Sequence, residues 1–382
     1  MHFTLHLSQR CNMRCSYCYA PPCDSPVMSE AVGRAAIDLG ARMTEGSCGV
    51  IFFGGEPLLH RDLIASLTDY AAKHPSGRLF HHKITTNGTL LDGEFLDYAV
   101  RSQMLVAMSF DGVREAHDLH RRAASGAPTW DLLLPKLKLL LEARPYSSVF
   151  MVVNPDTAQH LDASAQFLIE DLGVRYLIVS LNYAAAWTED DFEVLRRQYE
   201  KLGDRYLRWT RAGRKFYFSP FEVKISSHVN RDCHQKERCE LARRQVSVGP
   251  DGTLYPCVQF VHAGPDSGWR VGHVDTGIDE AARARLGQES SAEKPECDGC
   301  AIQQRCNNTC GCLNWQTTGG INTVSPVLCR HEQTVLPVVD RVARTLYRER
   351  QPLFLHKHYN EAYPFLSLIE DSEKRPAGNK TV

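Results

Sequence analysis

Residues 49–57, GVIFFGGEP, decide the fold, because a short apolar run is followed at once by a glycine-rich polar motif. Five more apolar runs of this kind occur along the chain, with amphipathic, helix-like stretches between them. They cover residues 2–8, 81–88, 104–112, 147–154 and 174–180. Strands that alternate with helices are typical of a parallel sheet. The sequence therefore predicts an α/β fold, namely a partial (β/α)6 barrel of the TIM type.

Composition and charge exclude several kinds of partner. The chain has 382 residues, 43% of them hydrophobic, which is enough to bury a sizeable core in two or three domains. With 44 Lys and Arg against 45 Asp and Glu, it has no basic excess for a nucleic acid or an anionic membrane surface. No stretch approaches the roughly 20 apolar residues of a membrane span, and the start, MHFTLHLSQR, does not resemble a signal peptide. We therefore expect a cytoplasmic protein with no membrane partner.

The 14 cysteines point to metal chemistry at both ends of the chain. In a reducing cytoplasm, cysteines at short spacings are more typical of metal ligands than of disulfides. None lies between Cys48 and Cys233, where strands and helices alternate. Beyond that region the sequence becomes rich in turns and cysteines up to Cys329. The expected parts are a barrel (1–214), a linker (215–232), a cysteine-rich domain (233–330), a C-terminal helical segment (331–365) and a disordered tail (366–382).

Polar motifs follow four of the predicted strands. Because ligands bind at the carboxyl ends of parallel strands, these motifs would line a single rim. The motifs are the cysteines at 11, 15 and 18, then GGEP (54–57), TTNG (85–88) and SFDG (109–112). Taken alone, GGEP is equally consistent with a tight turn into a helix.

The first of these motifs, CNMRCSYC at residues 11–18, has the spacing C-x3-C-x2-C and resembles the radical S-adenosylmethionine (SAM) enzymes. The resemblance implies that Cys11, Cys15 and Cys18 hold three irons of a 4Fe-4S cluster. The fourth iron would stay open for the amino and carboxylate groups of SAM, as a catalytic metal site keeps one position for its substrate. The alternative is a zinc knuckle, which would need Cys23 or a histidine as its fourth ligand.

The same resemblance implies a set of SAM-binding residues. The turn at residues 54–57 would receive the methionine amino group, with Glu56 adding negative charge beside it. Ser109 and Arg121 match positions that contact the ribose and the carboxylate, and the fork of an arginine suits a carboxylate. A solvated surface arginine is the alternative for Arg121. The whole set is Tyr17, Gly54, Gly55, Glu56, Pro57, Asn87, Ser109, Asp111 and Arg121, in which Asn87 and Asp111 are polar groups of the rim without an assigned role.

The C-terminal cysteines resemble the SPASM extension of radical SAM enzymes, which holds two auxiliary 4Fe-4S clusters. The pattern is C-x2-C-x5-C-x3-C over residues 297–310, preceded by Cys239, Gly252 and Cys257 and followed by Cys329. The resemblance implies that the first auxiliary cluster takes Cys233, Cys239, Cys257 and Cys310. It implies that the second takes Cys297, Cys300, Cys306 and Cys329. Two zinc ribbons are the alternative that the spacing alone permits.

Three cysteines are left outside these ligand sets: Cys23, Cys48 and Cys312. Cys312 lies two residues after Cys310 and could replace it, although the x3 spacing favours Cys310.

The known reactions of this class modify peptides and proteins. Sulfatase maturases, which the sequence resembles over most of its length, oxidise a sulfatase Cys or Ser to formylglycine. They carry an aspartate directly after the cysteine that matches Cys257, as a general base, whereas this chain has Val258 and then Gln259. Because valine cannot accept a proton, the sequence favours an oxidoreductase that abstracts hydrogen from another ribosomally made peptide and gives a crosslinked or oxidised product. Sulfatase maturation is the alternative, and a cysteine-rich zinc-binding scaffold is the alternative without enzymatic activity.

The expected partners follow from this chemistry. Ten residues precede Cys11, too few for the winged-helix module that grips the leader peptide in peptide-crosslinking relatives. The precursor peptide is therefore expected to be recognised by the barrel mouth, by the SPASM region or by a separate leader-binding protein. Reductive cleavage of SAM also needs an electron donor such as flavodoxin or ferredoxin. No side chain of the chain is assigned a catalytic role.

Overall fold

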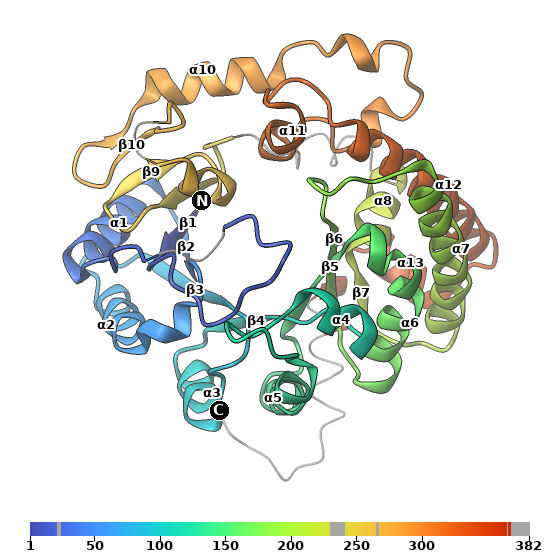
Figure 1. Cartoon of the computed structure of the whole chain (residues 1–382), viewed down its shortest axis with the longest axis horizontal. Coiled ribbons are helices and arrows are strands. Elements are labelled where there is room, and N and C mark those ends of the chain that lie inside the picture. Colours follow the sequence, from blue (N-terminus) through green and yellow to red (C-terminus); the bar gives the residue numbers. More distant parts are fainter. Residues whose placement is uncertain (21–23, 230–240, 265–266, 365, 368–382) are drawn as a thin grey trace.

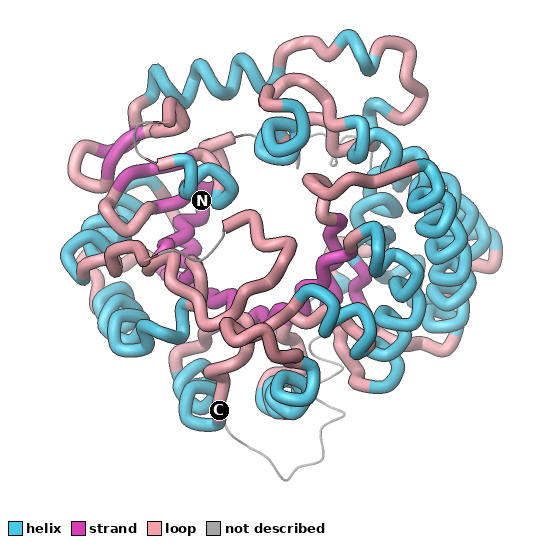
Figure 2. The backbone as a smooth tube through the Cα atoms, in the orientation of Figure 1, coloured by secondary structure: helices cyan, strands magenta, loops and turns pink. Residues whose placement is uncertain are grey.

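Eleven strands of the described chain join in one mixed sheet that curves round a central space (Figure 1). The computed structural model describes residues 1–20, 24–229, 241–264, 267–364 and 366–367. The strand order is β11-β10-β9-β8-β1-β2-β3-β4-β5-β6-β7. Figure 2 shows the strands on the inside and most helices on the outside. The predicted α/β fold class is confirmed.

The six predicted strands are present, and a short seventh continues the parallel part of the sheet. They are β1 (His2–His6), β2 (Ser47–Phe53), β3 (Leu79–Thr86), β4 (Leu105–Ser109), β5 (Ser148–Val153), β6 (Tyr176–Leu181) and β7 (Tyr217–Phe218). β2, β4 and β5 are largely apolar, whereas β1 and β3 mix apolar residues with polar ones. Because these strands run parallel, the motifs that follow β1 to β4 meet at one edge of the sheet.

Helices alternate with the strands as the sequence predicts, and Ser29 caps the first of them by accepting a hydrogen bond from the backbone N–H of Val32. The helices of the barrel are α1 (Glu30–Met43), α2 (Arg61–Ala72), α3 (Gly93–Arg101), α4 (Arg114–His120), α5 (Trp130–Ala143), α6 (Leu161–Gln166), α7 (Glu189–Arg211) and α8 (Ser219–Val229). Those of the C-terminal part are α10 (Glu280–Ser291), α11 (Gly311–Thr318), α12 (Pro326–Arg348) and α13 (Pro352–Tyr359).

The cysteine-rich part of the chain continues the sheet of the barrel. Strand β8 (Gln245–Val248) pairs in parallel with β1, from His2 opposite Gln245 to Leu5 opposite Val248. Three short antiparallel strands follow it: β9 (Thr253–Tyr255), β10 (Gly272–His273) and β11 (Gly277–Ile278). Helices α10 and α11 then lie on the side of the molecule opposite α3 and α5 (Figure 1).

The structure differs from the predicted division into parts at two places. Residues 215–232, expected to be a linker, contain β7 and α8, which pack against the sheet and against α12. The boundary expected at residue 331 falls inside α12, a continuous helix that spans Pro326–Arg348. The reason is that α12 packs along α7 of the barrel, so the cysteine-rich and helical segments share an interface with the barrel. Most of the predicted tail, residues 368–382, lies outside the described residues.

Helices α7 and α12 pack against each other, and both bury apolar side chains. Leu195 and Tyr199 of α7 and Val335 and Val339 of α12 are buried.

In the part of the chain that the structure describes, no helix is long and apolar enough to cross a membrane.

Gly203 of α7 packs closely against side chains of α12 and gives a test of this packing. A Cβ at this position would lie 2.9 Å from Val338 Cγ1 and 3.3 Å from Val342 Cγ2. We expect Gly203→Leu to lower the free energy of unfolding by about 1–3 kcal/mol, because the overpacked contact must move apart. The measurement is the urea midpoint followed by circular dichroism in anaerobically purified protein.

The matched control is Gly287→Leu in α10, where a Cβ would meet no atom within 4 Å. Removing a helical glycine without a steric conflict should raise stability by up to about 1 kcal/mol. Equal shifts of the midpoint in both variants would contradict the close packing of α7 on α12.

Candidate active site

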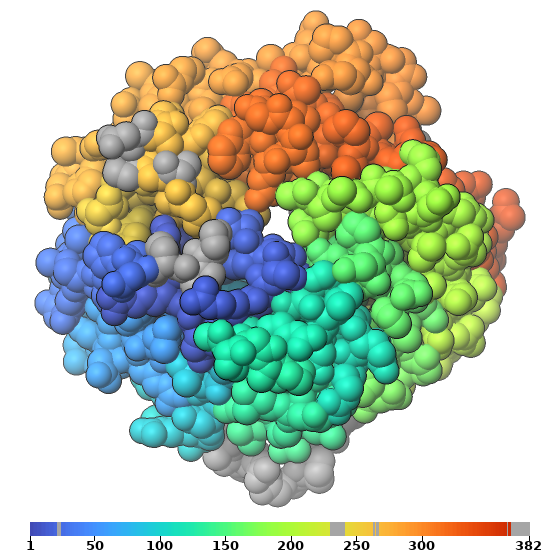
Figure 3. Space-filling model, in the orientation of Figure 1, coloured from blue at the N-terminus to red at the C-terminus, as the bar shows by residue number. Residues whose placement is uncertain are grey.

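A cavity of about 690 Å³ opens at the carboxyl ends of the parallel strands. Its wall comes from the segments that follow β1, β2, β3, β4 and β6, and from the C-terminal part of the chain. Figure 3 shows the molecule hollowed where the N-terminal loop, the region after β6 and the C-terminal region meet. A cavity of this size falls in the range of about 300–1,000 Å³ that small-molecule and cofactor sites occupy.

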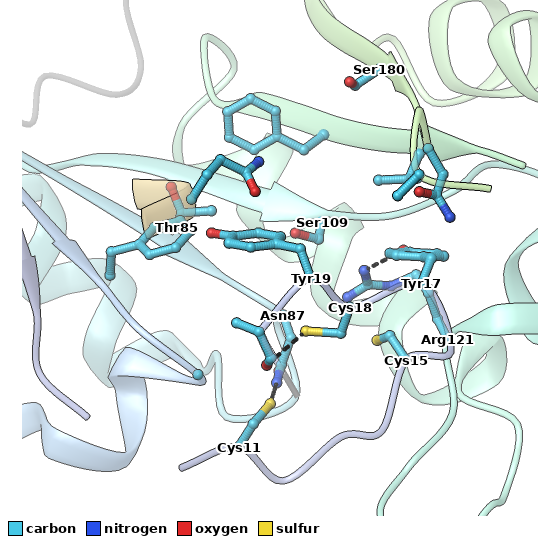
Figure 4. A pocket seen from close by; sticks show the side chains of 18 of the residues that line it. Cys11, Cys15, Tyr17, Cys18, Tyr19, Thr85, Asn87, Ser109, Arg121 and Ser180 are labelled. Carbon is cyan, nitrogen blue, oxygen red and sulfur yellow. Dashed lines mark hydrogen bonds between the residues drawn. The ribbon is translucent and has the colours of Figure 1, made fainter. Parts of the chain in front are cut away.

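The loop that follows β1 brings the thiols of Cys11, Cys15 and Cys18 into the wall of this cavity (Figure 4). The backbone holds the loop in place. Met13 forms a β-bridge with Ala123, Arg14 N donates to Arg122 O (2.8 Å) and Ser16 N donates to His120 O (3.1 Å). The three thiols therefore occupy a fixed loop anchored to the segment after α4.

The sulfur of Cys11 already has hydrogen-bond donors. It accepts from Met13 N (3.4 Å) and from Asn87 Nδ2 (3.6 Å). Burial nevertheless raises the pKa of the Cys11 thiol to about 11, and it raises the pKa of Cys15 and of Cys18 as well. Iron ligation would release these protons, since the thiolate is the form that binds a metal.

A buried charged network joins the cysteine loop to the strands. Arg121 Nη1 donates to the hydroxyl of Tyr17 (2.9 Å), and that hydroxyl donates to Asp111 Oδ2 (2.6 Å). Burial raises the pKa of Asp111, and the charge of Arg121 and the hydrogen bond from Tyr17 oppose that rise. Arg121 is only 4% exposed, so the sequence alternative of a solvated surface arginine does not apply. The Arg121 side chain lines the cavity, and its buried Nε has no hydrogen-bond partner among the described residues.

The glycine turn after β2 packs directly on the start of the cysteine loop. Gly54 has φ +136°, and a Cβ there would lie 2.3 Å from the carbonyl oxygen of Ser8. Gly55 N donates to Ser8 O (2.9 Å) and Glu56 N donates to Arg10 O (2.8 Å). Only glycine fits position 54, because both the backbone conformation and the close approach exclude a side chain.

Glu56 lies beneath this turn, and its carboxylate binds the polypeptide. Oε1 accepts from Leu58 N (3.0 Å) and Thr86 Oγ1 (2.7 Å), and Oε2 accepts from Asn87 N (2.7 Å). The side chain is 1% exposed, and burial raises its pKa although the three hydrogen bonds oppose that rise. Glu56 therefore ties the end of β3 to the glycine turn, and the role predicted for it toward SAM stays a prediction.

The predicted site residues divide into those that line the cavity and those that are buried behind it. Those that line the cavity are Cys11, Cys15, Tyr17, Cys18, Gly54, Gly55, Asn87, Ser109 and Arg121. Glu56, Pro57 and Asp111 do not line it and are buried behind it.

The described C-terminal cysteines fall into two groups. The thiols of Cys257, Cys310 and Cys312 interact with one another. In the second group, Cys329 interacts with Cys297 and Cys300, and Cys306 interacts with Cys297. Cys23, Cys233 and Cys239 lie outside the described residues. Within the described residues, no three His, Cys, Asp or Glu side chains lie together as ligands of one single metal ion, and the ligand sets of the larger iron-sulfur clusters stay predictions.

Hydrogen-bond donors surround the sulfurs in both groups, as metal thiolates require. Cys257 Sγ accepts from the backbone N–H groups of Val258 and Gln259 and from the Cys312 thiol, and these bonds lower its pKa. In the second group Asn308 Nδ2 donates to Cys297 Sγ (3.4 Å) and Gln333 Nε2 donates to Cys329 Sγ (3.6 Å). The donor sets thus fit thiolate ligands of iron-sulfur clusters.

The sequence did not predict several of the residues that line the cavity. They are Tyr19, Ser180, Asn182, Tyr183, Gln259 and Gln316. Ser180, Asn182 and Tyr183 lie at the carboxyl end of β6, so the strand-end rule that found the other motifs would have found them too. Gln259 and Gln316 form an amide–amide hydrogen bond across the cavity wall, from segments that only the fold brings together.

Tyr183 is held by a hydrogen-bonded chain that leads into the interior. Its hydroxyl bonds to His331 Nδ1 (2.8 Å), and His331 Nε2 bonds to the hydroxyl of Tyr199 (2.8 Å). Burial lowers the pKa of His331 to about 3, so its imidazole is neutral. These hydrogen bonds fix the loop after β6 against α12.

Comparison with known proteins agrees with this geometry. Residues 5–168 match the model of the Radical SAM superfamily. The chain is 26% identical over 332 residues to the serine-type anaerobic sulfatase-maturating enzyme of Klebsiella aerogenes, covering 78% of this chain and 76% of that enzyme. It is 23% identical over 328 residues to the cysteine-type enzyme of Clostridium perfringens, covering 79% and 86%.

Solved structures give the same fold. The chain superposes on native anSMEcpe with bound AdoMet and Cp18Cys peptide with a TM-score of 0.76 and 19% identity, over 90% of this chain and 99% of that one. It superposes on Streptococcus suis SuiB bound to precursor peptide SuiA with a TM-score of 0.60 and 13% identity, over 86% and 75%.

Fold, cysteine loop and comparisons agree, and this chain carries a radical SAM domain and is an enzyme. Its relatives are anaerobic sulfatase-maturating enzymes. The domain implies one 4Fe-4S cluster and SAM as cofactors.

The position of Glu56 leads to a test of its role. In Glu56→Gln, a side-chain NH2 group replaces one carboxylate oxygen. It then faces one or more of the donors Leu58 N, Thr86 Oγ1 and Asn87 N, from which it cannot accept a hydrogen bond. We expect the free energy of unfolding to fall by roughly 1.5–3 kcal/mol, the value of a hydrogen bond to a charged group. The control is Glu94→Gln, which changes an exposed glutamate in the first turn of α3. Weaker SAM binding, measured by calorimetry, with unchanged stability would instead mean that Glu56 contacts the cofactor directly.

Proposed function

We propose that this enzyme oxidises a residue of a peptide or protein substrate bound in the cavity. The observation that carries the proposal is the meeting of the cysteine loop, Arg121 and the C-terminal cysteines Cys310 and Cys312 around one space. When bound, a 4Fe-4S cluster and SAM supply a 5'-deoxyadenosyl radical that abstracts hydrogen from carbon. The chain's own residues must hold the cofactor, orient the substrate and keep water out.

Cys11, Cys15 and Cys18 would hold the SAM-binding cluster, each thiolate on a different iron. Ser109 ends β4 and the glycine turn (54–57) follows β2, with β3 between these two strands. Ser109 would receive the ribose, and the turn would receive the methionine amino group. Arg121 would bind the carboxylate through its buried guanidinium, which Tyr17 and Asp111 position. A buried, pre-oriented cation binds an anion with little loss of side-chain entropy.

Two auxiliary clusters would occupy the C-terminal cysteines. The first would take Cys233, Cys239, Cys257 and Cys310, and the second would take Cys297, Cys300, Cys306 and Cys329. Once the substrate has lost a hydrogen atom, completing a two-electron oxidation requires that it lose one proton and one further electron. The auxiliary clusters would accept that electron, because a fully cysteine-ligated cluster has no open iron for substrate.

Two substrate classes are in view, each favoured by one observation. The alignment over more than three quarters of the chain favours a sulfatase segment oxidised to formylglycine. Val258 favours another ribosomally made peptide, since the resemblance implies an aspartate there as the general base. A SuiB structure holds a precursor peptide, and its fold supports a peptide in the cavity of this chain as well. An electron donor such as flavodoxin or ferredoxin and a separate leader-binding protein are the further proposed partners.

Iron content tests the cluster assignment. Anaerobically reconstituted protein should hold about twelve irons in three four-iron clusters. Replacing Cys11, Cys15 and Cys18 together by Ala should remove about four irons and abolish reductive cleavage of SAM, because the cofactor then has no iron to bind. The control is Cys48→Ala, a buried thiol of β2 away from the cavity, which should keep the full content. An unchanged iron content in the triple variant would contradict the assignment of Cys11, Cys15 and Cys18 as cluster ligands.

Product analysis separates the two substrate classes. With a sulfatase-derived peptide, we expect the enzyme to consume SAM without forming formylglycine, because Val258 offers no proton acceptor. Mass spectrometry of the peptide and quantification of 5'-deoxyadenosine give the two readings. Formylglycine at a rate that matches SAM cleavage would establish the sulfatase-maturating activity and would require another base. Introducing the base by Val258→Asp is the matched gain-of-function variant.

A further inference from the structure

Two glutamine side chains, Gln259 and Gln316, line the cavity on the wall that the C-terminal part of the chain forms. Gln259 lies in the short 3-10 helix η4 (Val258–Ala263), and Gln316 lies in α11 (Gly311–Thr318). Gln316 Nε2 donates a hydrogen bond to Gln259 Oε1, although the two residues are 57 positions apart in the chain. The two amides therefore form one polar unit that only the fold assembles.

Aromatic packing beside the glutamines fixes this unit. Phe260, next to Gln259, packs on Trp315, next to Gln316, with ring centroids 5.0 Å apart. Trp269 packs on both rings, at 4.5 Å from Phe260 and 5.5 Å from Trp315. Phe260 is fully buried. Because the backbone beside each glutamine is held in place, the pair is ordered before a ligand arrives, and less entropy is lost on binding.

The amide–amide hydrogen bond leaves a donor and an acceptor of the pair unused. A glutamine amide has two N–H groups and one oxygen with two lone pairs. Gln259 Nε2 and Gln316 Oε1 make no hydrogen bond to another described residue, and neither atom is fully buried, so a ligand can reach both. Turning both amides over would reverse the two roles and would again leave one donor and one acceptor.

The charge of the cavity wall indicates which ligand this pair fits. Among the described residues that line the cavity, Arg121 is the only Asp, Glu, Lys, Arg or His, and the proposed function assigns it to the carboxylate of SAM. Other members of the lining, such as Leu181 and Leu313, are apolar. A charged group would be buried at the glutamines without a counter-charge. A main-chain peptide group is neutral and offers one C=O and one N–H, which are the two partners that the pair lacks.

We propose that Gln259 and Gln316 bind a main-chain peptide group of the substrate. The unused N–H of the pair donates to the peptide C=O, and the unused oxygen accepts from the peptide N–H. This inference rests on the proposed function, since it needs a peptide or protein substrate in the cavity. The contact is made with the backbone and does not depend on the side chain of the bound residue. It fixes the position of the neighbouring substrate carbon relative to the cysteine loop, and hydrogen abstraction depends on that position.

The test measures peptide binding without turnover, in full-length, anaerobically reconstituted protein with SAM and without a reductant. The probes are a sulfatase-derived peptide and two analogues in which the amide before or after the target Cys is replaced by an ester. An ester has no N–H group and is a weaker acceptor. We expect the wild type to bind at least one ester analogue about two- to tenfold more weakly, as the loss of one hydrogen bond implies.

The variants are Gln259→Ala, Gln316→Ala and the double variant. Each should bind the parent peptide about two- to tenfold more weakly. The two losses should not add in the double variant, because the amides act as a unit, and this variant should no longer distinguish the esters from the parent peptide. Gln259→Glu keeps the acceptor for Gln316 but turns a carboxylate toward the peptide C=O, so it should weaken binding as well and decides the matter if an alanine variant does not fold.

The matched control is Gln288→Ala, which removes an exposed glutamine of α10 and should leave every affinity unchanged. Unchanged peptide affinity in the double variant and in Gln259→Glu would overturn the inference. Equal affinity of the wild type for all the probes, or for none of them, would overturn it as well, because a backbone contact does not require a particular sequence. If the wild type also binds no member of a pool of random-sequence peptides, the peptide substrate of the proposed function is contradicted too, which separates the two failures.

Discussion

The parallel pairing of β8 with β1 is the interaction on which the rest of the structure depends. Residues 2–5 hydrogen-bond with residues 245–248, so the first strand of the chain is an inner strand with neighbours on both sides. The same pairing brings the segment after β9, with Gln259, to a cavity whose other wall follows β1 directly. These backbone hydrogen bonds join the start of the described cysteine-rich part to the barrel, and the packing of α12 on α7 joins its end.

The barrel could be predicted from the sequence because its strands are long apolar runs that end in polar motifs. The strands that join the cysteine-rich part to the barrel could not. β8 to β11 have two to four residues each, too short for an alternating pattern. β8, which joins them to the barrel, is defined by its pairing with β1, far away in the chain. β7 was missed for the same reason: it has two residues and pairs with β6, whereas the sequence suggested a linker there. Non-local pairing leaves no local signal.

The candidate site shows a similar division between what residue types reveal and what the fold decides. The family resemblance carried by the spacing of Cys11, Cys15 and Cys18 implied that Arg121 belongs to the same site, and all four side chains line the cavity. Glu56 was predicted as a cavity residue from its motif, yet its carboxylate turns inward to three donors that belong to β3 and to its own turn. The orientation of the Glu56 carboxylate depends on which hydrogen-bond donors have no other acceptor. This can be known only when the position of the neighbouring strand is known.

The bridge between Met13 and Ala123 has a consequence for how the protein acquires its metal. The loop of residues 11–18 is tied by backbone hydrogen bonds to residues 120–124, and Ala124 N donates to Asn12 O (3.2 Å) in addition to the bonds of Arg14 and Ser16. Fixing a residue costs roughly 1–2 kcal/mol of conformational entropy. For this loop the entropy is lost when the polypeptide folds, before any metal binds. Iron and sulfide would then enter an ordered cradle, so the binding free energy at this loop goes into affinity and little of it into ordering the chain.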